Sequence, residues 1–403
     1  MGTSMKSEIL EKAYELKNQL ITWRRDFHQH PELGFEEVRT SKIVAEHLES
    51  LGIETTRNIG KTGVVGLIKG KSEGPTIALR ADMDALPMED RKTVDYRSKV
   101  PGKAHACGHD AHTSMLMGAA KVLAEMGGPE KGNIKFIFQP AEEGLGGAPA
   151  MIEDGVLSNP TVNRIAGLHI DPMLPSGTLA VVRNQAMAAA DTFEVKIIGV
   201  GGHAARPHQT VDSITVASEV ISALQHVVSR QIDPLDPAVL TIGKIEGGSA
   251  YNIIAPEVTF IGTVRTLNPE VREAMPNKME SIIKGVTEAF GANYEFNYDM
   301  GYPSVINDDQ MVDLLDQTAK ELVGDSNFNY IKPSMGGEDF SYYTKHIPGV
   351  FFRLGASKDG SYPLHHPLFD INDEILPLGS AALVQLALNF LNNETKQHNG
   401  GQS

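Results

Sequence analysis

The sequence of 403 residues contains a single cysteine, Cys107, so no disulfide bond can form within the chain. Proteins of oxidising compartments commonly carry such bonds, and the shortage of cysteine therefore fits a reducing cytoplasm. The first residues also lack the apolar segment that marks a secretion signal. From these two features we expect the protein to act in the cytoplasm.

Basic charge and long apolar runs are scarce as well. The chain carries 36 Lys and Arg against 51 Asp and Glu, a formal net charge of -15. It therefore lacks the positive field with which proteins hold the phosphate backbone of nucleic acids. It also lacks a run of about 18 consecutive apolar residues, the length that a membrane-spanning helix needs. We expect neither nucleic acid nor a membrane as a partner.

What is present is an ordinary globular composition. Hydrophobic residues make up 41% and charged residues 22%, enough for packed cores beneath a solvated surface. A chain of this length exceeds one typical domain, so two domains are expected. The sequence shows neither internal repeats nor a low-complexity linker.

Three short apolar segments are typical of buried strands, and helical patterns alternate with them. They are Thr76–Arg80, Ile134–Phe138 and Arg164–Leu168. This alternation predicts an α/β domain with a parallel or mixed sheet flanked by helices. Each strand ends in acidic residues or a histidine, at the sheet edge where open α/β proteins place their chemistry. These residues are Asp82 and Asp84, Glu142 and Glu143, and His169.

A different pattern occupies residues 188–299. Its strands and helices follow the order β-α-β-β-α-β, which is typical of a ferredoxin-like split unit. We therefore predict a small α+β domain inserted into a larger domain that consists of residues 1–187 and 300–403. The expected strands are Thr192–Val200, Ala238–Glu246, Glu257–Thr266 and Asn293–Asp299, and the expected helices are Asp212–Gln231 and Pro269–Phe290.

The densest group of potential metal ligands lies at His105–His112, where three histidines accompany the only cysteine. Cys107 and His109 are two residues apart, so in an extended or loop backbone both side chains can converge on one ion. A thiolate and an imidazole suit zinc and its first-row neighbours. Taken alone, the segment could also be a polar loop with chance histidines, so the rest of the chain must supply further ligands.

Other strand ends and loops provide enough ligands for more than one ion. The candidates are Cys107, His109, Glu143, His169 and either His365 or His366. Two ions that share a bridging thiolate would use five ligands, as in hydrolases that bind water and polarise a carbonyl. In the adjacent pair Glu142-Glu143, one side chain can bind metal while the other acts as a general base. Asp84 is suited to hold a ligating histidine in orientation.

Each of these residues also has an ordinary structural explanation. Adjacent glutamates are usually a solvated acidic pair, and a histidine after an apolar strand usually makes one hydrogen bond. Aspartates after a strand are often turn or cap residues, and a histidine pair before a proline can belong to a plain loop. The joint occurrence of these residue types at successive strand ends favours a metal site.

Nine longer segments carry a more specific signal. They are Arg25–Glu36, Leu79–Pro87, His105–His112, Gln139–Gly144, Gly167–Ile170, Gly201–His208, Tyr251–Pro256, Gly262–Thr266 and Met335–Phe340. In sequence and order they resemble the M20 metallopeptidases, specifically the amidohydrolase branch with N-acyl-amino-acid deacylases, hippurate hydrolases and plant auxin-conjugate hydrolases. The resemblance implies a zinc-exopeptidase-like catalytic α/β domain and an inserted ferredoxin-like lid that often mediates dimers.

The resemblance also implies two divalent metal ions bridged by Cys107. The remaining ligands would be Glu143 and His365 on one ion, and His109 and His169 on the other. Zinc, manganese, cobalt and nickel all suit such ligands, so the identity of the metal stays open.

The resemblance also assigns roles to the neighbours of these ligands. It implies that Glu142 is the general base and that Asp84 supports the neighbour of Glu142. The motif position favours His365 over His366, which stands where the family often has serine.

In the inserted domain the resemblance singles out three residues. His203 would reach the active site of a partner subunit and stabilise the oxyanion, a role in which one donor is worth about 3 kcal/mol. Asn252 and Arg265 would bind the substrate's carboxylate, which a guanidinium fork matches. Without the resemblance they are a surface histidine, a turn asparagine and a strand-edge arginine. A homodimer or a higher homo-oligomer is therefore expected.

Together these features predict a metal-dependent amidohydrolase that cleaves N-acyl amino acids, N-acetyl ones among them, to amino acid and carboxylate. One alternative is a dipeptidase or carboxypeptidase on the same scaffold, and another is a non-hydrolytic protein that binds or stores metal. A cysteine hydrolase that uses Cys107 is a further alternative, but it explains neither Glu142-Glu143 nor His169. The acyl group and the amino acid are left open by the sequence.

Overall fold

The computed structural model describes residues 3–399 and shows two compact units. The first combines residues 3–184, 306–332 and 342–399, and the second consists of Gln185–Val305 with Pro333–Ser341. The predicted insertion at 188–299 therefore lies within the second unit. Each unit has its own hydrophobic core, as is usual for separate domains.

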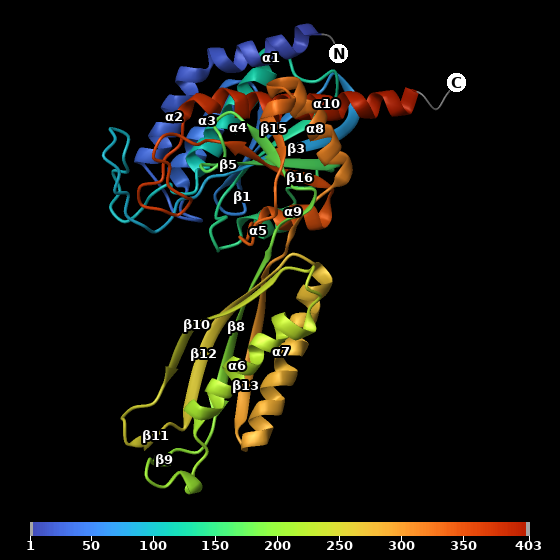
Figure 1. Ribbon diagram of the computed structural model, residues 1–403. Helices are drawn as coiled ribbons and strands as arrows, with labels where there is room; N and C mark the ends of the chain where they lie inside the picture. Colours follow the sequence, from blue (N-terminus) through green and yellow to red (C-terminus); the bar gives the residue numbers. More distant parts are fainter. Residues whose placement is uncertain (1–2, 400–403) are drawn as a thin grey trace. The chain divides into compact units, whose positions relative to one another are not determined.

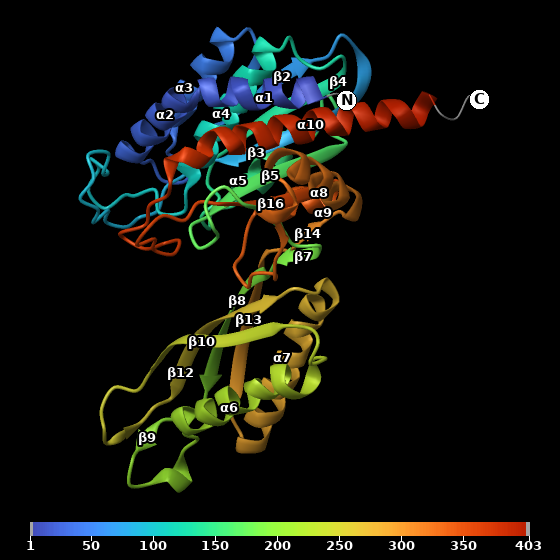
Figure 2. The ribbon, with the colours of Figure 1, turned by 45° about the horizontal axis from the view of Figure 1, so that its top comes forward.

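The first unit is built on an eight-stranded sheet in the order β1-β2-β4-β3-β5-β16-β6-β15 (Figures 1 and 2). Neighbouring strands among β4, β3, β5 and β16 are parallel, whereas antiparallel pairs occur toward both margins. The sheet is therefore mixed, as predicted. The strands are β1 (Glu54–Ile59), β2 (Gly63–Lys69), β3 (Ser72–Asp82), β4 (Lys131–Gln139), β5 (Arg164–Asp171), β6 (Leu179–Val181), β15 (Phe328–Tyr330) and β16 (Gly349–Gly355).

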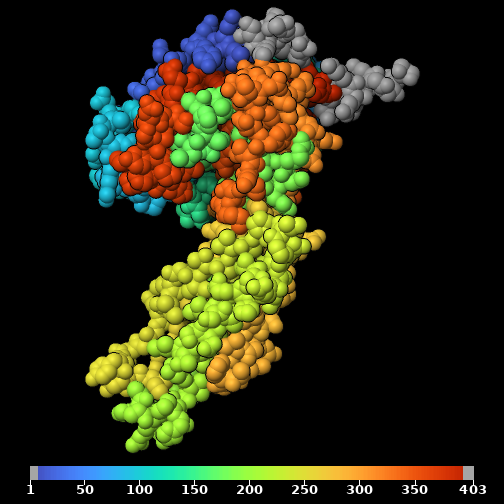
Figure 3. Space-filling view, in the orientation of Figure 1, coloured from blue at the N-terminus to red at the C-terminus, as the bar shows by residue number. Residues whose placement is uncertain are grey.

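Helices flank this sheet. α4 and α10 pack on β3, β4 and β5, and α1 and α2 contact these two helices in turn. On the face shown in Figure 3, the blue N-terminal segment lies next to red and orange C-terminal segments. The helices of this unit are α1 (Thr3–Glu15), α2 (Lys17–Gln29), α3 (Val38–Ser50), α4 (His109–Glu125), α5 (Gly147–Glu153), α8 (Asp309–Val323), most of α9 (Phe340–His346) and α10 (Leu376–Asn399), with the 3-10 turns η2 (Asp325–Asn327) and η3 (Asp373–Ile375).

The closing helix is apolar on nearly all sides because it lies in the core. Among the described residues, one helical segment, Asp373–Asn393, is long and apolar enough to cross a membrane by length and composition alone. However, 89% of its most apolar window is buried inside the protein. Ser380, Gln385 and Asn389 interrupt its apolar run, which is why the sequence shows no continuous one. The burial identifies it as a core helix.

The second unit is an antiparallel four-stranded sheet in the order β10-β12-β8-β13, packed against α6 and α7. On β12, buried and more exposed residues alternate, because one face lies under the helices and the other is solvated. Along the chain the elements follow the predicted order β-α-β-β-α-β. They are β8 (Ala189–Ile198), α6 (Ser213–Gln231), β10 (Ala238–Gly247), β12 (Glu257–Thr266), α7 (Pro269–Phe290) and β13 (Asn293–Tyr302).

A short ribbon extends from one end of this four-stranded sheet (Figure 1). In it β9 (Gly202–His203) pairs with β11 (Ile253–Ile254), and the 3-10 turn η1 (Pro207–Gln209) follows β9. Two further short strands, β7 (Asn184–Met187) and β14 (Val305–Asn307), lie where the chain passes from one unit to the other.

Two elements differ from the predictions made from the sequence. α4 begins at His109, within the segment expected as extended or loop backbone, because Gly108 caps it with a left-handed φ of 91°. His109 and His112 therefore lie on the first turn of a helix rather than in a loop. At the sheet margin, β1 was not predicted, because its residues are largely polar and exposed and form no apolar run.

Candidate metal centre

The candidate ligands come from four stretches of the chain that meet at one edge of the first unit's sheet. Cys107 and His109 lie at the start of α4, Glu143 follows β4, His169 lies near the end of β5, and His365 lies in the loop after β16. The ligand atoms of Cys107, His109 and His169 lie within 4.8 Å of one another. Those of Cys107, Glu143 and His365 do so as well. The structure thus brings all five predicted ligands into two groups that share Cys107.

Two of the histidines direct the same ring nitrogen toward the cluster. The Nδ1 of His109 lies 3.0 Å from the main-chain oxygen of Asp84, and the Nδ1 of His169 lies 2.6 Å from that of Ile170. Each Nδ1 therefore carries the proton and donates it to oxygen, which leaves a lone pair on each Nε2. The Nε2 of His169 lies 3.5 Å from Sγ of Cys107.

Asp84 joins two of the predicted ligands. Its Oδ1 lies 3.1 Å from Nδ1 of His109, and its Oδ2 accepts a hydrogen bond of 2.9 Å from the main-chain N–H of Glu143. Asp84 is buried, and hydrogen bonds are stronger in such a low-dielectric setting. This geometry suits the predicted supporting role, and it adds a link to Glu143 that the sequence does not show.

Gly108 allows α4 to begin against the end of β5. Its φ of 91° lies in the left-handed region, which favours glycine. A Cβ at this position would lie 2.5 Å from Cγ1 of Ile170, closer than two carbon atoms can pack. Because Ile170 follows His169, this close approach places Cys107 and His109 beside His169.

The loop that carries Glu142 and Glu143 is held by Glu37. Oε1 of Glu37 accepts a hydrogen bond of 2.8 Å from the main-chain N–H of Ala141, and burial raises the pKa of Glu37 to about 7. A carboxylate oxygen of Glu142 lies within 4.8 Å of ligand atoms of His109 and Glu143. Glu142 is therefore next to the predicted ligands while remaining outside both ligand groups that contain Cys107.

The residues present fit divalent metal ions. Nε2 of His109 is buried, has no hydrogen-bond partner among the described residues and lies 4.0 Å from Oε1 of Glu143. Burial raises the pKa of the Cys107 thiol to about 12, so a thiolate forms there only beside a positive charge. Coordination to a metal deprotonates a thiol outright. Thiolate, imidazole and carboxylate donors together match zinc and its first-row neighbours.

The structure distinguishes the adjacent histidines His365 and His366. Nε2 of His365 lies 3.2 Å from Oε1 of Glu143, and the carboxylate of Glu143 raises the pKa of His365. The ring of His366 instead stacks on Tyr362 with centroids 4.4 Å apart, and its Nδ1 accepts a hydrogen bond from the main-chain N–H of Leu368. The geometry favours His365 as the ligand, as the motif position does.

The three predicted residues of the second unit fall into two places. His203 lies in β9, and Asn252 directly precedes β11; the main-chain N–H of Ala204 donates to the main-chain oxygen of Asn252 at 3.1 Å. Both are exposed. Arg265 lies near the far end of β12, eight residues or about 27 Å from the start of that strand. Its guanidinium donates to Oγ1 of Thr263. His203 and Asn252 are therefore neighbours, whereas Arg265 is remote from them within this unit.

Sequence reasoning assigned no site role to three buried residues beside the cluster, namely Arg80, Asp82 and His112. Asp82 has the position of a turn or cap residue, yet it is fully buried and its Oδ2 lies 3.7 Å from Nε2 of His109. His112 belongs to the Cys/His segment but bonds Asp82 rather than joining the ligands. The available signal was their place in the motif segments Leu79–Pro87, which also holds Asp84, and His105–His112, which holds Cys107 and His109.

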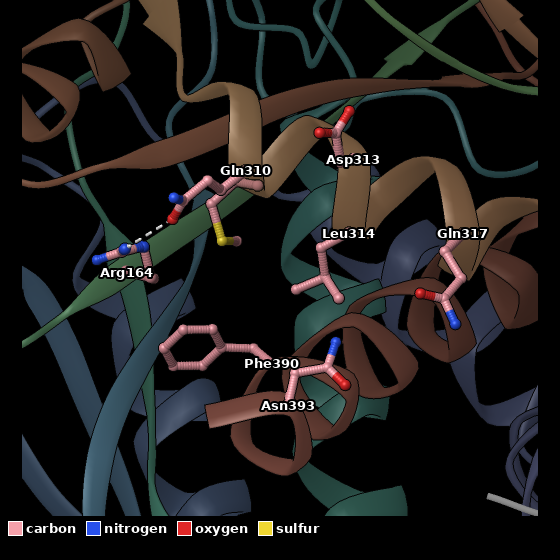
Figure 4. A pocket seen from close by; sticks show the side chains of 8 residues that line it. Arg164, Gln310, Asp313, Leu314, Gln317, Phe390 and Asn393 are labelled. Atoms are coloured by element: carbon pink, nitrogen blue, oxygen red, sulfur yellow. Dashed lines mark hydrogen bonds between the residues drawn. The ribbon is translucent and has the colours of Figure 1, made fainter. Parts of the chain in front are cut away.

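A separate cavity of about 350 Å³ is lined by Arg164 of β5 and by residues of α8 and α10 (Figure 4). Arg164 contacts Gln310 there at 3.5 Å. Arg164 begins β5, whereas His169 lies five residues further along, about 17 Å away. None of the predicted site residues is among the described residues that line this cavity. It does not form part of the candidate metal centre.

Known proteins match this chain over most of its length. The model of peptidase family M20/M25/M40 matches residues 78–389. An N-acyl-L-amino acid amidohydrolase from Geobacillus stearothermophilus is 45% identical over 306 residues, 76% of this chain and 82% of that protein. Thermostable carboxypeptidase 2 from Saccharolobus solfataricus is 40% identical over 385 residues, 94% of this chain and 97% of that protein.

A solved structure gives the same result for the fold. The crystal structure of the YXEP protein of Bacillus subtilis, described as a dinuclear metal-binding peptidase of the M20 family, matches with a TM-score of 0.83 and 37% sequence identity. The match covers 94% of this chain and 99% of that one. It confirms the predicted α/β fold with a small inserted domain. The chain therefore belongs to peptidase family M20/M25/M40 and, within it, to the branch of metal-dependent amidohydrolases.

Proposed function

We propose that this protein hydrolyses the amide bond of N-acyl amino acids, N-acetyl amino acids among them, to free amino acid and carboxylate. The observation that carries the proposal is the pair of ligand groups that share Cys107, with the buried carboxylate of Glu142 beside them. The similarity to the amidohydrolase of Geobacillus stearothermophilus supports the substrate class. A cysteine ligand requires a reduced thiol, which suits a cytoplasmic location.

In this proposal the five residues would hold two divalent ions, and Cys107 belongs to both ligand groups. His109 and His169 would complete one site, and Glu143 and His365 the other. Bound ions would polarise the amide carbonyl and lower the pKa of a water molecule. Zinc, manganese, cobalt or nickel would each suit these donors.

Glu142 carries the proton transfers. Its carboxylate takes one proton from the attacking water, whose oxygen bonds to the carbonyl carbon. It then gives that proton to the amide nitrogen as the carbon–nitrogen bond breaks, so that the amino acid leaves as a neutral amine. The acyl group leaves as a carboxylic acid, which loses its remaining proton to solvent and becomes the carboxylate. Burial of Glu142 keeps competing bulk water away from the carboxylate.

The second unit supplies the groups that recognise the substrate. We assign oxyanion stabilisation to His203, and carboxylate binding to Asn252 and Arg265. Because Arg265 and the pair His203 and Asn252 lie at opposite ends of β12, one copy of this unit is unable to bring them all to one small substrate. This separation supports a homodimer in which a partner subunit's His203 completes the site.

A carboxypeptidase or dipeptidase activity is the second candidate. It is favoured by the similarity to thermostable carboxypeptidase 2 of Saccharolobus solfataricus. Both activities cleave an amide next to an amino acid with a free carboxylate, so the same metal centre would serve either. They differ in the group on the other side of the amide, which is an acyl group in one case and a peptide in the other.

The deciding experiment is amine release from a substrate panel. The protein would be stripped with a chelator and assayed with N-acetyl, N-benzoyl and longer N-acyl amino acids and with plain dipeptides, each with and without manganese, zinc, cobalt or nickel. We expect release from acyl amino acids that returns only with added metal. Release from dipeptides alone would move the assignment to peptidase, and the absence of release with every metal would contradict hydrolysis.

A further inference from the structure

The sheet of the first unit opens where the candidate ligands gather. β3 and β4 remain paired to Asp82 and Gln139, but β3 and β5 separate after Arg80 and Gly167. β5 continues to Asp171 alongside β16. The main-chain N–H groups beyond Gly167 that face β3 therefore have no acceptor from that strand.

The ring of His112 enters this opening and replaces the missing strand. Its Nε2 accepts a hydrogen bond of 2.9 Å from the main-chain N–H of Ile170, the residue after His169. A main-chain N–H is always a donor, so this Nε2 carries no proton and the ring proton must be on Nδ1. Nδ1 lies 2.6 Å from Oδ1 of Asp82 and donates to it. Burial lowers the pKa of His112, in agreement with a neutral ring.

Asp82 links His112 to the end of β4 through Arg80 and Gln139. Its Oδ2 accepts a hydrogen bond of 2.6 Å from Nη1 of Arg80, and Nε of Arg80 donates to Oε1 of Gln139 at 2.8 Å. Gln139 ends β4, three residues before Glu142. Asp82 and His112 are thus the centre of a connected buried path that reaches the ends of β3, β4 and β5.

The location of this path is informative because its members are costly to bury. Arg80 is 1% exposed, Asp82 0%, His112 2% and Gln139 0%. Buried ionic groups stabilise a fold little or not at all relative to well-packed apolar side chains of the same volume. This polar path joins the three strand ends next to His109 and His169. Its burial is therefore explained better by a function at the metal centre than by a contribution to the stability of the core.

We propose that His112 and Asp82 are positioning residues of the metal centre, which hold the end of β5 so that His169 faces Cys107 and His109. This inference rests on the proposed metal centre. His112 acts on His169 through the adjacent main-chain N–H of Ile170. Asp82 holds the His112 ring in the required tautomer, and Arg80 compensates the charge of Asp82.

Two substitutions of His112 each keep one of its two hydrogen bonds and remove the other. The side-chain amide of Gln reaches the position of Nε2, so His112→Gln keeps an acceptor for Ile170. The amide of Asn ends near Nδ1, so His112→Asn keeps a donor for Asp82 but leaves Ile170 without its acceptor. His47→Asn is the matched control, since His47 is a partly buried histidine of α3 that bonds the main-chain oxygen of Met117.

Three readouts are needed. Cobalt affinity is measured by chelator competition, and the visible spectrum of the cobalt-loaded protein reports the thiolate and the ligand geometry. Hydrogen exchange of the metal-free protein reports protection of the peptide that contains Ile165–Asp171. Values of kcat and KM are measured with the best substrate. We expect His112→Asn to lose about 10- to 100-fold in cobalt affinity, the usual effect of removing a group that orients a ligand.

The expected pattern is specific to a positioning role. His112→Asn should show a changed cobalt spectrum, faster exchange in Ile165–Asp171, and a fall in kcat with little change in KM. His112→Gln should recover most of the affinity and protection, and His47→Asn should match the wild type in all three readouts.

Two results would overturn the proposal. One is unchanged cobalt affinity and spectrum in His112→Asn, and the other is a loss of affinity without faster exchange at Ile165–Asp171. Failure of the proposed function has a different signature. A protein that binds cobalt but hydrolyses no acyl amino acid would contradict the substrate assignment, while the comparison of His112→Asn with His112→Gln would still decide the positioning role.

Discussion

Glu142 and Glu143 are neighbours in the sequence but have different surroundings. Glu143 belongs with Cys107 and His365 to one ligand group, and its carboxylate lies 3.2 Å from the His365 ring. Glu142 lies beside His109 and Glu143 but outside that group. A general base must reach the attacking water without being occupied as a ligand. The two positions therefore suit a division of work between proton transfer and metal binding.

Glu142→Gln is expected to lower kcat by about 10²- to 10⁴-fold, because an amide is unable to accept the proton of water. The substitution keeps the shape of the side chain, so the metal content should stay that of the wild type. Turnover and metal content by elemental analysis would be measured together. Glu153→Gln, at an exposed glutamate of α5, serves as the control. An active Glu142→Gln enzyme would contradict the role of this residue as the base.

His365→Ala and His366→Ala form a matched pair at adjacent positions. The first is expected to weaken metal binding at one site by more than about 100-fold, since losing a ligand should exceed the loss of a group that only orients one. The second removes a ring that stacks on Tyr362 and should leave metal affinity unchanged. Titration of the stripped proteins with cobalt measures both. The reverse pattern would identify His366 as the ligand.

At the scale of elements, the start of α4 depends on one backbone conformation. Gly108→Ala would place a Cβ 2.5 Å from Ile170 at a φ of 91°, and both strain and contact should destabilise the metal-free protein by about 3 kcal/mol. Gly127→Ala introduces only backbone strain, at a φ of 80°, since its Cβ would have no non-neighbouring atom within 4 Å. It should lower the free energy of unfolding by about 1 kcal/mol. Urea unfolding compares them, and equal losses would show that the contact with β5 is unimportant.

The loop between β4 and α5 should make stability depend on pH through Glu37. Burial raises its pKa from 4.5 to about 7, so the folded protein binds this proton more tightly than the unfolded chain. The stability that Glu37 contributes is therefore complete below about pH 4.5 and is lost as the pH rises through about 7.

Glu37→Gln removes this titration but keeps an Oε1 acceptor for the main-chain N–H of Ala141. We expect the free energy of unfolding of the variant, relative to the wild type, to rise by about 3 kcal/mol between pH 4.5 and 8. Urea titrations at four pH values across this range measure it. A difference that stays constant with pH would show that Glu37 is ionised in the folded protein throughout.

At the scale of the whole molecule, the second unit separates two groups that the proposed reaction needs together. His203 and Asn252 lie at the ribbon of β9 and β11, and Arg265 lies at the far end of β12. A substrate the size of an acyl amino acid is too small to span that strand. We therefore expect activity to require an oligomer, with the dimer as the smallest form.

Mixing two inactive variants tests this expectation. In the dimer formed from His203→Ala and Glu142→Gln subunits, one site would combine an intact Glu142 with the intact His203 of the partner subunit. Activity should therefore return when the two proteins are unfolded, mixed and refolded together. Neither protein should recover when it is treated alone. The absence of recovery in a mixed oligomer, verified by mass spectrometry, would place His203 and Glu142 in the same subunit's site.

Much of the fold was predictable because its signals are local. The strands around Thr76–Arg80, Ile134–Phe138 and Arg164–Leu168 are short apolar runs, and their order with the intervening helices indicates the mixed sheet. β1 was not predictable in this way, since a polar edge strand lacks that pattern. The start of α4 was also missed, because a left-handed glycine cap depends on the packing of Gly108 against Ile170.

By itself the sequence determined which residue types bear the chemistry and on which strand ends they stand, because apolar runs, turn residues and motif spacing are properties of neighbouring residues. The motif position favours His365 over His366, but only the tertiary structure shows that His365 approaches Glu143. Only the tertiary structure also shows that the two ring nitrogens of His112 bond Asp82 and Ile170. His112 and Ile170 are 58 residues apart in the chain. Such contacts form only after the sheet and α4 have packed, because the direction of a ring nitrogen depends on partners that the sequence places far away.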